Sequence, residues 1–172
     1  MRVPIETPAR ARDDSTMLKT LPLLVCLGSG IVGGVFFAFS TFVMKALAEL
    51  PAPHGIAAMQ RINVVVLGPL FLSVFVGTAV LAGICVLAGF FPWGETKSFL
   101  LLAAGVLYIV GSFGITVALN VPRNERLARM DAESADAAAY WPRYVREWLL
   151  WNHVRTAASV AAAGCAAAAL IA

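Results

Sequence analysis

The chain has 172 residues, of which 60% are apolar and 13% charged, and its formal net charge is +3. With a mean hydropathy of +0.81, this composition excludes an ordinary soluble domain and is typical of a membrane protein. The length allows one compact bundle and no separate soluble domain. Basic residues are scattered along the chain, so nucleic acid is not an expected partner.

The first 17 residues are polar and contain two prolines and the acidic pair Asp13–Asp14. They predict a flexible N-terminal tail. The apolar run from Leu21 to Val43 exceeds the core of a typical signal peptide, so we interpret it as part of a retained transmembrane helix. Within it, Gly30 and Gly34 form a small-xxx-small pair that favours close contact with another helix.

Prolines interrupt the rest of the apolar chain. Pro51 and Pro53 predict a turn after the first helix. Pro69 lies inside the second apolar run, where it cannot donate a backbone hydrogen bond and is expected to kink the helix. Pro122 follows the third run; it disfavours helix at Val121 and removes one backbone donor, so carbonyls near Thr116 to Ala118 are expected to be available.

The sequence therefore predicts an all-α integral membrane protein, a four-transmembrane-helix bundle formed by residues 18–172. Four spans place both termini on one side and gather most polar residues at the opposite face. Positive-inside counting does not decide the orientation, and a plasma or inner membrane is the expected location. The expected spans are 18–48, 56–89, 98–119 and 142–172, with a polar connector at 120–141.

The fourth span opens with an unusual polar and aromatic stripe. Positions 148, 151, 152, 155 and 159 share one helical face, whereas His153 points about 100° away from Asn152. Charged and amide groups are costly in lipid, so the stripe predicts a site facing the bundle interior. An interfacial aromatic belt with a snorkelling arginine is the alternative. The stripe consists of Trp141, Tyr144, Trp148, Trp151, Asn152, Arg155 and Ser159.

At these residues the chain resembles the anthrone-oxygenase-like integral membrane proteins, whose bacterial members are grouped as a domain of unknown function. The resemblance covers about residues 25 to 165. It implies a four-helix membrane bundle and, for the named members, oxidation of anthrones to anthraquinones by dioxygen without metal or flavin. The matching segments are Phe-Ser-Thr-Phe-Val-Met at 39–44, Met59 to Asn63, Asn-Val-Pro-x-Asn-x-x-Leu at 120–127, and Trp-x-x-Trp-Asn-His-Val-Arg-Thr at 148–156.

Anthrone oxidation requires a protein to hold a flat ring, take a proton and stabilise an oxyanion. The predicted oxyanion donors are Arg155, Asn152, Asn120 and Asn63. Arg155 is expected to face the interior and bond Asn63, Asn120 or Asn124. His153 is a candidate base by residue type, although its direction argues against it, and Glu147 and His54 are rivals. The predicted substrate contacts are Trp148, Trp151, Asn63, Asn120, Asn124, Met44 and Thr41.

Other interpretations stay open. The asparagines are also suited to capping and to interhelical hydrogen bonds. His54 and His153 are the two histidines and lie on different elements, so neither a metal nor another cofactor is predicted. The alternative function is a non-catalytic membrane module that binds a lipid, quinone or partner protein, for which the tryptophans should face lipid. Expected partners are a small aromatic or lipid-like ligand and membrane lipids, and a homo-oligomer is left open.

Overall fold

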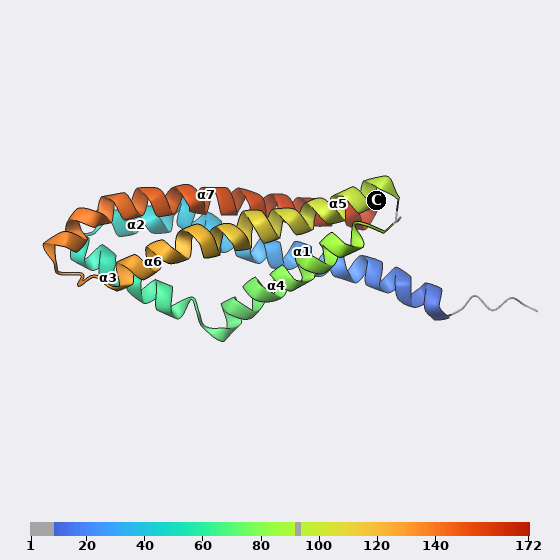
Figure 1. The fold of residues 1–172 in the computed structure, drawn as a ribbon, viewed down its shortest axis with the longest axis horizontal. Coiled ribbons are helices and arrows are strands. Elements are labelled where there is room, and N and C mark those ends of the chain that lie inside the picture. Colours follow the sequence, from blue (N-terminus) through green and yellow to red (C-terminus); the bar gives the residue numbers. More distant parts are fainter. Residues whose placement is uncertain (1–8, 92–93) are drawn as a thin grey trace, which may run out of the picture.

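The computed structural model describes residues 9–91 and 94–172, and these form helices without strands (Figure 1). Four helical rods in this part of the chain, Lys19–Glu49, Pro69–Ala88, Glu95–Ala128 and Ala135–Ile171, are long and apolar enough to cross a membrane. The predicted all-α four-helix membrane bundle is therefore confirmed. The elements are α1 (Ala9–Ala38), η1 (Phe39–Val43), α2 (Met44–Glu49), α3 (Ala52–Val65), α4 (Pro69–Ala88), α5 (Glu95–Val106), η2 (Leu107–Gly114), η3 (Thr116–Asn120), α6 (Val121–Ala128) and α7 (Ala135–Ile171), where η marks π-helical turns.

The long helix α7 packs against both α1 and the continuous α5–η2–η3–α6 rod. Close approach depends on small residues: a Cβ added to Gly111 would lie 2.5 Å from the Cβ of Ala158 in α7. The predicted pair Gly30 and Gly34 is not at such a contact, because no described atom beyond their own helix lies within 4 Å of either position. Gly33, between them, faces Ser159 instead.

The bundle is longer than a bilayer is thick. At 1.5 Å per residue, the 20 residues of α4 extend about 30 Å, which matches the hydrocarbon core. The 37 residues of α7 extend about 55 Å, so about 25 Å of the bundle projects beyond the hydrocarbon. We call this projecting part the cap; it consists of α2, α3, α6 and residues 135–147 of α7, at the end away from the C-terminus (Figure 1).

The second predicted span, 56–89, is two helices instead of one kinked helix. α3 ends at Val65, Gly68 is extended with ψ 151°, and α4 begins at Pro69. The physical reason is that Pro69 has no N–H to continue the helix, whereas it fits the first turn of a new one. The chain turns sharply at this α3–α4 break, residues 66–68, so that α3 and α4 diverge from it (Figure 1).

The third span does not end before Pro122. The rod is continuous through this proline, because the π-helical turn η3 precedes it and α6 continues to Ala128. In η3 the Val121 N–H bonds the Thr116 carbonyl five residues back, and this wider turn accommodates Pro122. Of the carbonyls expected to be available, that of Thr116 thus accepts from the Val121 N–H. The nearby Leu119 carbonyl accepts from Arg123 Nη1 at 2.6 Å.

The boundaries of the other helices also differ from those predicted. α7 begins at Ala135 instead of residue 142, because the Ser134 hydroxyl caps it by accepting from the Ala137 N–H. Most of the predicted connector 120–141 is therefore helical. α1 begins at Ala9, inside the predicted flexible tail, and residues 1–8 of that tail lie outside the described residues. The start of α1 and the end of α7 lie at the same end of the bundle (Figure 1).

Candidate functional site

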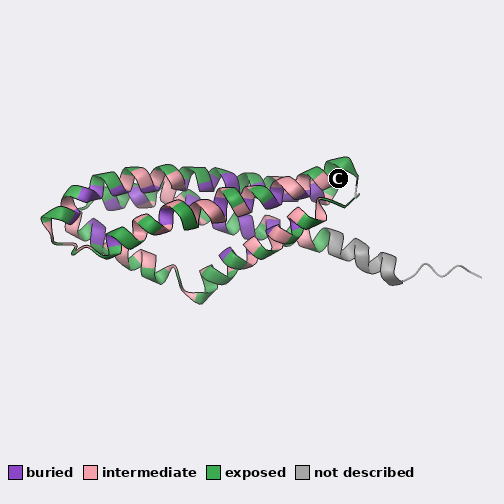
Figure 2. Ribbon diagram, viewed as in Figure 1, coloured by how far each residue is buried: buried purple, intermediate pink, exposed green. Residues whose placement is uncertain are grey.

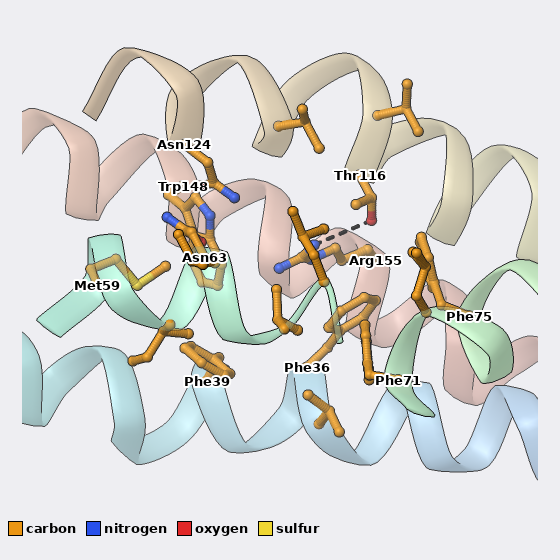
Figure 3. Close-up of a pocket in the computed structure, with 18 of the residues that line it drawn as sticks. Phe36, Phe39, Met59, Asn63, Phe71, Phe75, Thr116, Asn124, Trp148 and Arg155 are labelled. Atoms are coloured by element: carbon orange, nitrogen blue, oxygen red, sulfur yellow. Dashed lines mark hydrogen bonds between the residues drawn. The ribbon is translucent and has the colours of Figure 1, made fainter. Parts of the chain in front are cut away.

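A cavity of about 500 Å³ lies between α1, α3, α4, the η2–α6 segment and α7. Its wall is mostly apolar, and its rings come from separate helices: Phe36 from α1, Phe71 and Phe75 from α4, and Phe113 from η2. Figure 3 shows Arg155 between the phenylalanines on one side and a polar group around Trp148 on the other. The cavity therefore joins an aromatic compartment to a polar one.

Arg155 is the charged group at the centre of this cavity. Its side chain is 6% exposed. Its Nε donates to Asn152 Oδ1 at 2.9 Å and its Nη1 to Thr116 Oγ1 at 3.2 Å. The guanidinium carbon lies 3.9 Å from the ring centre of Phe36 and 4.9 Å from that of Trp148. The rings compensate part of the cost of burying the charge.

No carboxylate of the described residues comes within 4.0 Å of Arg155. Two of the five guanidinium N–H donors have protein partners. A buried charge is costly without an opposite charge or a full set of hydrogen bonds. The remaining N–H groups of Arg155 can therefore donate to an anionic or strongly accepting oxygen of a ligand in the cavity.

Neighbouring polar groups fix the orientation of the Arg155 guanidinium. The amide nitrogen of Asn152 donates to the Phe36 carbonyl at 2.8 Å and to Ser40 Oγ at 2.7 Å, which leaves its Oδ1 facing Arg155 Nε. On the other side, the Thr116 hydroxyl donates to the Ser112 carbonyl at 2.8 Å and can accept from Arg155. Asn152 thus orients the guanidinium from the side away from the cavity and is not itself part of the cavity wall.

The polar compartment contains Asn63, Asn124 and Trp148 (Figure 3). Trp148 is 3% exposed and packs on Phe39, with ring centres 5.5 Å apart, while its indole Nε1 has no hydrogen-bond partner among the described residues. Asn63 lies near the Tyr144 hydroxyl, but its Nδ2 makes no hydrogen bond of good geometry within the described chain. Asn124 Oδ1 accepts from that hydroxyl at 2.9 Å. A buried donor without a partner costs about 1–3 kcal/mol, so Trp148 favours a ligand that brings a second acceptor.

Only part of the predicted stripe reaches the cavity wall. Trp148 and Arg155 are seven residues apart and point in nearly the same direction, whereas Trp151 and Asn152 lie about 60° and 40° to either side. Trp151 is half-buried outside the wall, and His153 is exposed. Arg155 faces the interior as expected, but it bonds Asn152 and Thr116 instead of the predicted Asn63, Asn120 or Asn124.

Three other predicted substrate contacts are not in the wall. Asn120 is fully buried, and its amide donates to the Trp148 carbonyl at 3.1 Å. Met44 is fully buried in the core of the cap, and the exposed Thr41 donates back to the Phe37 carbonyl at 2.8 Å. Asn120 therefore makes an interhelical hydrogen bond and Thr41 a bond back to its own helix, roles that the sequence had left open beside ligand contact.

The rival bases also lie elsewhere. Glu147 is paired with Arg123 and Arg143 at 3.2 Å and 2.7 Å, outside the cavity wall, and His54 is exposed at the start of α3. Among the described residues, the carboxylate that does line the cavity is Glu125, at the cap end, 3.7 Å from Arg129. The part of the chain that the structure describes brings no three His, Cys, Asp or Glu side chains together as a metal site.

Sequence reasoning missed Gln60, Glu125 and the phenylalanine wall. Gln60 donates to the carbonyls of Leu127 and Met130, both at 2.9 Å, and so fastens α3 to the end of α6. The sequence did indicate these two positions indirectly. Gln60 lies in the Met59–Asn63 segment and Glu125 in the 120–127 segment, both of which match the family resemblance. The phenylalanines gave no such indication, because aromatic residues within apolar spans are common.

A cavity walled by aromatic rings, holding one buried arginine without a carboxylate and set in four membrane-spanning helices, defines a membrane protein with an internal site for a small ligand. The chain belongs to the anthrone oxygenase family, whose family model matches residues 58–165. The matched region contains Asn63, Asn124, Trp148 and Arg155. No curated protein and no solved structure matches the chain.

Proposed function

We propose that the chain oxidises a flat phenolic or polyketide-derived aromatic compound with dioxygen in this cavity, without a cofactor. The observation that carries the proposal is Arg155: a guanidinium that is 6% exposed, has no carboxylate partner among the described residues and lies in an apolar cavity. Such a group suits a reaction in which negative charge develops on an otherwise apolar substrate. Membership of the anthrone oxygenase family supports the same reaction class.

The shape and lining of the cavity suit fused aromatic rings. Its volume of about 500 Å³ falls within the range usual for small-molecule sites. Phe71 and Phe75 stack with ring centres 5.9 Å apart, and Phe113 lies 5.2 Å from Phe75, which gives an aromatic surface for one side of a ring system. Trp148 lies at the other side of Arg155 (Figure 3). A ring placed between them brings its oxygen substituent to the guanidinium.

In the proposed reaction, the substrate is a ketone whose methylene carbon lies between two aromatic rings. Loss of one proton from that carbon moves negative charge onto the ketone oxygen, where the free N–H groups of Arg155 stabilise it. The electron-rich carbon then forms a bond to dioxygen, and a proton completes a hydroperoxide. Loss of water leaves a second ketone, so one oxygen atom ends in the product and the other in water. Because Asn152 and Thr116 hold Arg155 in place beforehand, little reorganisation is required.

We assign the first proton transfer to Glu125, directly or through water. Its carboxylate lines the cavity at the cap end, where it is exposed and in contact with solvent. His153 is exposed and lies outside the wall, so it is not our candidate. A carboxylate that meets both the cavity and water can pass the proton on to the solvent.

The test is oxygen uptake by the purified chain in lipid vesicles, with 1,8-dihydroxyanthrone and no added metal or flavin. Empty vesicles correct for the spontaneous oxidation of this compound. The proposal expects uptake above that background, one molecule of water and one anthraquinone per dioxygen, and no effect of a chelator. Uptake equal to that of empty vesicles would contradict it. Saturable binding without uptake would instead support the non-catalytic module that the sequence left as the alternative.

A further inference from the structure

One side of the cavity wall is formed by residues that are also exposed on the outside of the bundle. Val64 of α3, Leu67 of the α3–α4 break and Val117 of η3 line the cavity and are 61%, 64% and 51% exposed. Side chains that line a cavity and are also largely exposed mark an opening. All three are apolar, and Val76 of α4, also exposed, continues the same rim. We call these four residues the rim.

The backbone is irregular at the same place. α3 and α4 diverge at the α3–α4 break (Figure 1). There the end of α3 is closed by two hydrogen bonds between residues three positions apart, Leu67 N–H to the Val64 carbonyl and Gly68 N–H to the Val65 carbonyl. Non-helical backbone at membrane depth is tolerated where it is buried in protein or lines a cavity. Val66 and Leu67 do line the cavity. The break therefore forms part of the cavity wall at this place.

The rim faces the bilayer. α4 begins at Pro69, directly after the break, and its length matches the hydrocarbon core. The break, with Leu67 in it and Val64 beside it, therefore lies at the boundary between acyl chains and headgroups, and Val76 lies within the hydrocarbon. Exposed residues lie on the helices on both sides of the break (Figure 2), and the exposed rim residues are all apolar. By contrast, the wall at the cap end carries the exposed carboxylate of Glu125, together with the half-buried amide of Gln60 and the exposed Ala128.

We propose that the rim is a lateral portal through which the ligand enters the cavity from the bilayer. The ligand is then an apolar ring compound dissolved in the membrane, and its one anionic or accepting oxygen is drawn to Arg155. This inference rests on the proposed function. The polar opening at the cap serves water and protons, while the ring compound uses the membrane side, where it is concentrated.

The test measures how fast a probe reaches the cavity, not how fast it reacts. The probe is anthracene-2-carboxylate, three fused rings with one anionic group, added to vesicles that contain the full chain. Energy transfer from tryptophan, of which Trp148 lines the cavity, reports its arrival. Val117→Phe narrows the portal. Its matched control is Val110→Phe, on the same rod, equally apolar, 62% exposed and outside the wall.

The portal predicts that Val117→Phe slows association on the order of 10-fold, whereas Val110→Phe leaves the rate unchanged. Leu67→Phe, with Leu70→Phe as its control, provides a second pair should Val117→Phe fail to fold. Unchanged rates in both rim variants, or slow association in an Ala128→Phe variant alone, would overturn the portal in favour of access through the cap. No energy transfer in the unmodified chain would overturn both the portal and the proposed ligand site.

Discussion

The cap and the membrane-spanning half of the bundle bury different side chains. In the cap, large residues such as Met44, Ile56, Leu127 and Tyr144 are fully buried around one another. In the membrane half, the buried side chains of α7 beyond Arg155 are alanines and hydroxyls, such as Ser159 donating to Ser112 at 2.8 Å. Water drives large apolar side chains together, whereas lipid does not, so helices in lipid associate through close backbone approach and interhelical hydrogen bonds.

The cavity lies where these two kinds of packing meet. Its wall takes Met59, Asn63 and Asn124 from the cap and Phe75 and Phe113 from the membrane half. Because α3 and α4 diverge at the break, neither half closes the space between them. A buried arginine is tolerated at this junction because polar groups hold it and it faces a cavity instead of lipid.

The largest effect is expected from the cap side of the cavity. Replacing Glu125 by Gln removes the proposed proton acceptor, so turnover of 1,8-dihydroxyanthrone should fall about 10²-fold or more, the range for general bases. Probe binding should stay within about twofold, since Glu125 lies at the cap end of the wall. Glu133→Gln is the control, because that residue is exposed and outside the wall. Equal turnover in both variants would remove Glu125 from the reaction.

Truncating a buried side chain of the cap should lower the free energy of unfolding. Leu127 is fully buried there and lies outside the cavity wall. Leu127→Ala should lower the free energy of unfolding by about 2–5 kcal/mol, because it leaves a void among large side chains. Denaturation in detergent micelles, followed by the loss of tertiary structure, would measure this. A change below about 1 kcal/mol would show that the cap is not packed like a water-soluble core.

Overpacking a close helix contact in the membrane half should lower the free energy of unfolding by a smaller amount. Gly111→Ala places a methyl group 2.5 Å from the Cβ of Ala158, so overpacking should cost about 1–3 kcal/mol. Gly164→Ala is the matched control, because no described atom outside its own helix lies within 4 Å of the added carbon, and it should be neutral or slightly stabilising. Equal stability of the two variants would contradict the close packing of η2 on α7.

The four spans and the central pair of the site could be predicted from the sequence, for definite reasons. Long apolar runs specify membrane helices, and a spacing of seven residues puts Trp148 and Arg155 on one face whatever the bundle geometry. Whether Trp151 lines the cavity could not be predicted. Its side chain points about 60° away from that of Trp148, so it reaches either the cavity or a neighbouring helix, depending on how α7 is rotated about its axis.

The limits of the helices depended on tertiary context. Pro69 and Pro122 carry the same local signal, yet the first separates two helices and the second continues one, because a π-helical turn precedes Pro122. The partners of Arg155 were also beyond the sequence, since Thr116 is 39 positions away and is one of several hydroxyls in apolar runs. The phenylalanine wall had no periodic signal at all, because every face of α4 is apolar.

The most direct test of the account compares Arg155→Gln with His153→Gln. The two residues lie on the same helix two positions apart, but Arg155 is buried in the cavity wall and His153 is exposed outside it. With both proteins folded in vesicles, oxygen uptake with 1,8-dihydroxyanthrone should fall on the order of 10²-fold in Arg155→Gln, the scale seen when one oxyanion donor is lost. It should change little in His153→Gln. Undiminished uptake by Arg155→Gln would contradict the account, and a steep loss in His153→Gln alone would make the histidine the catalytic group.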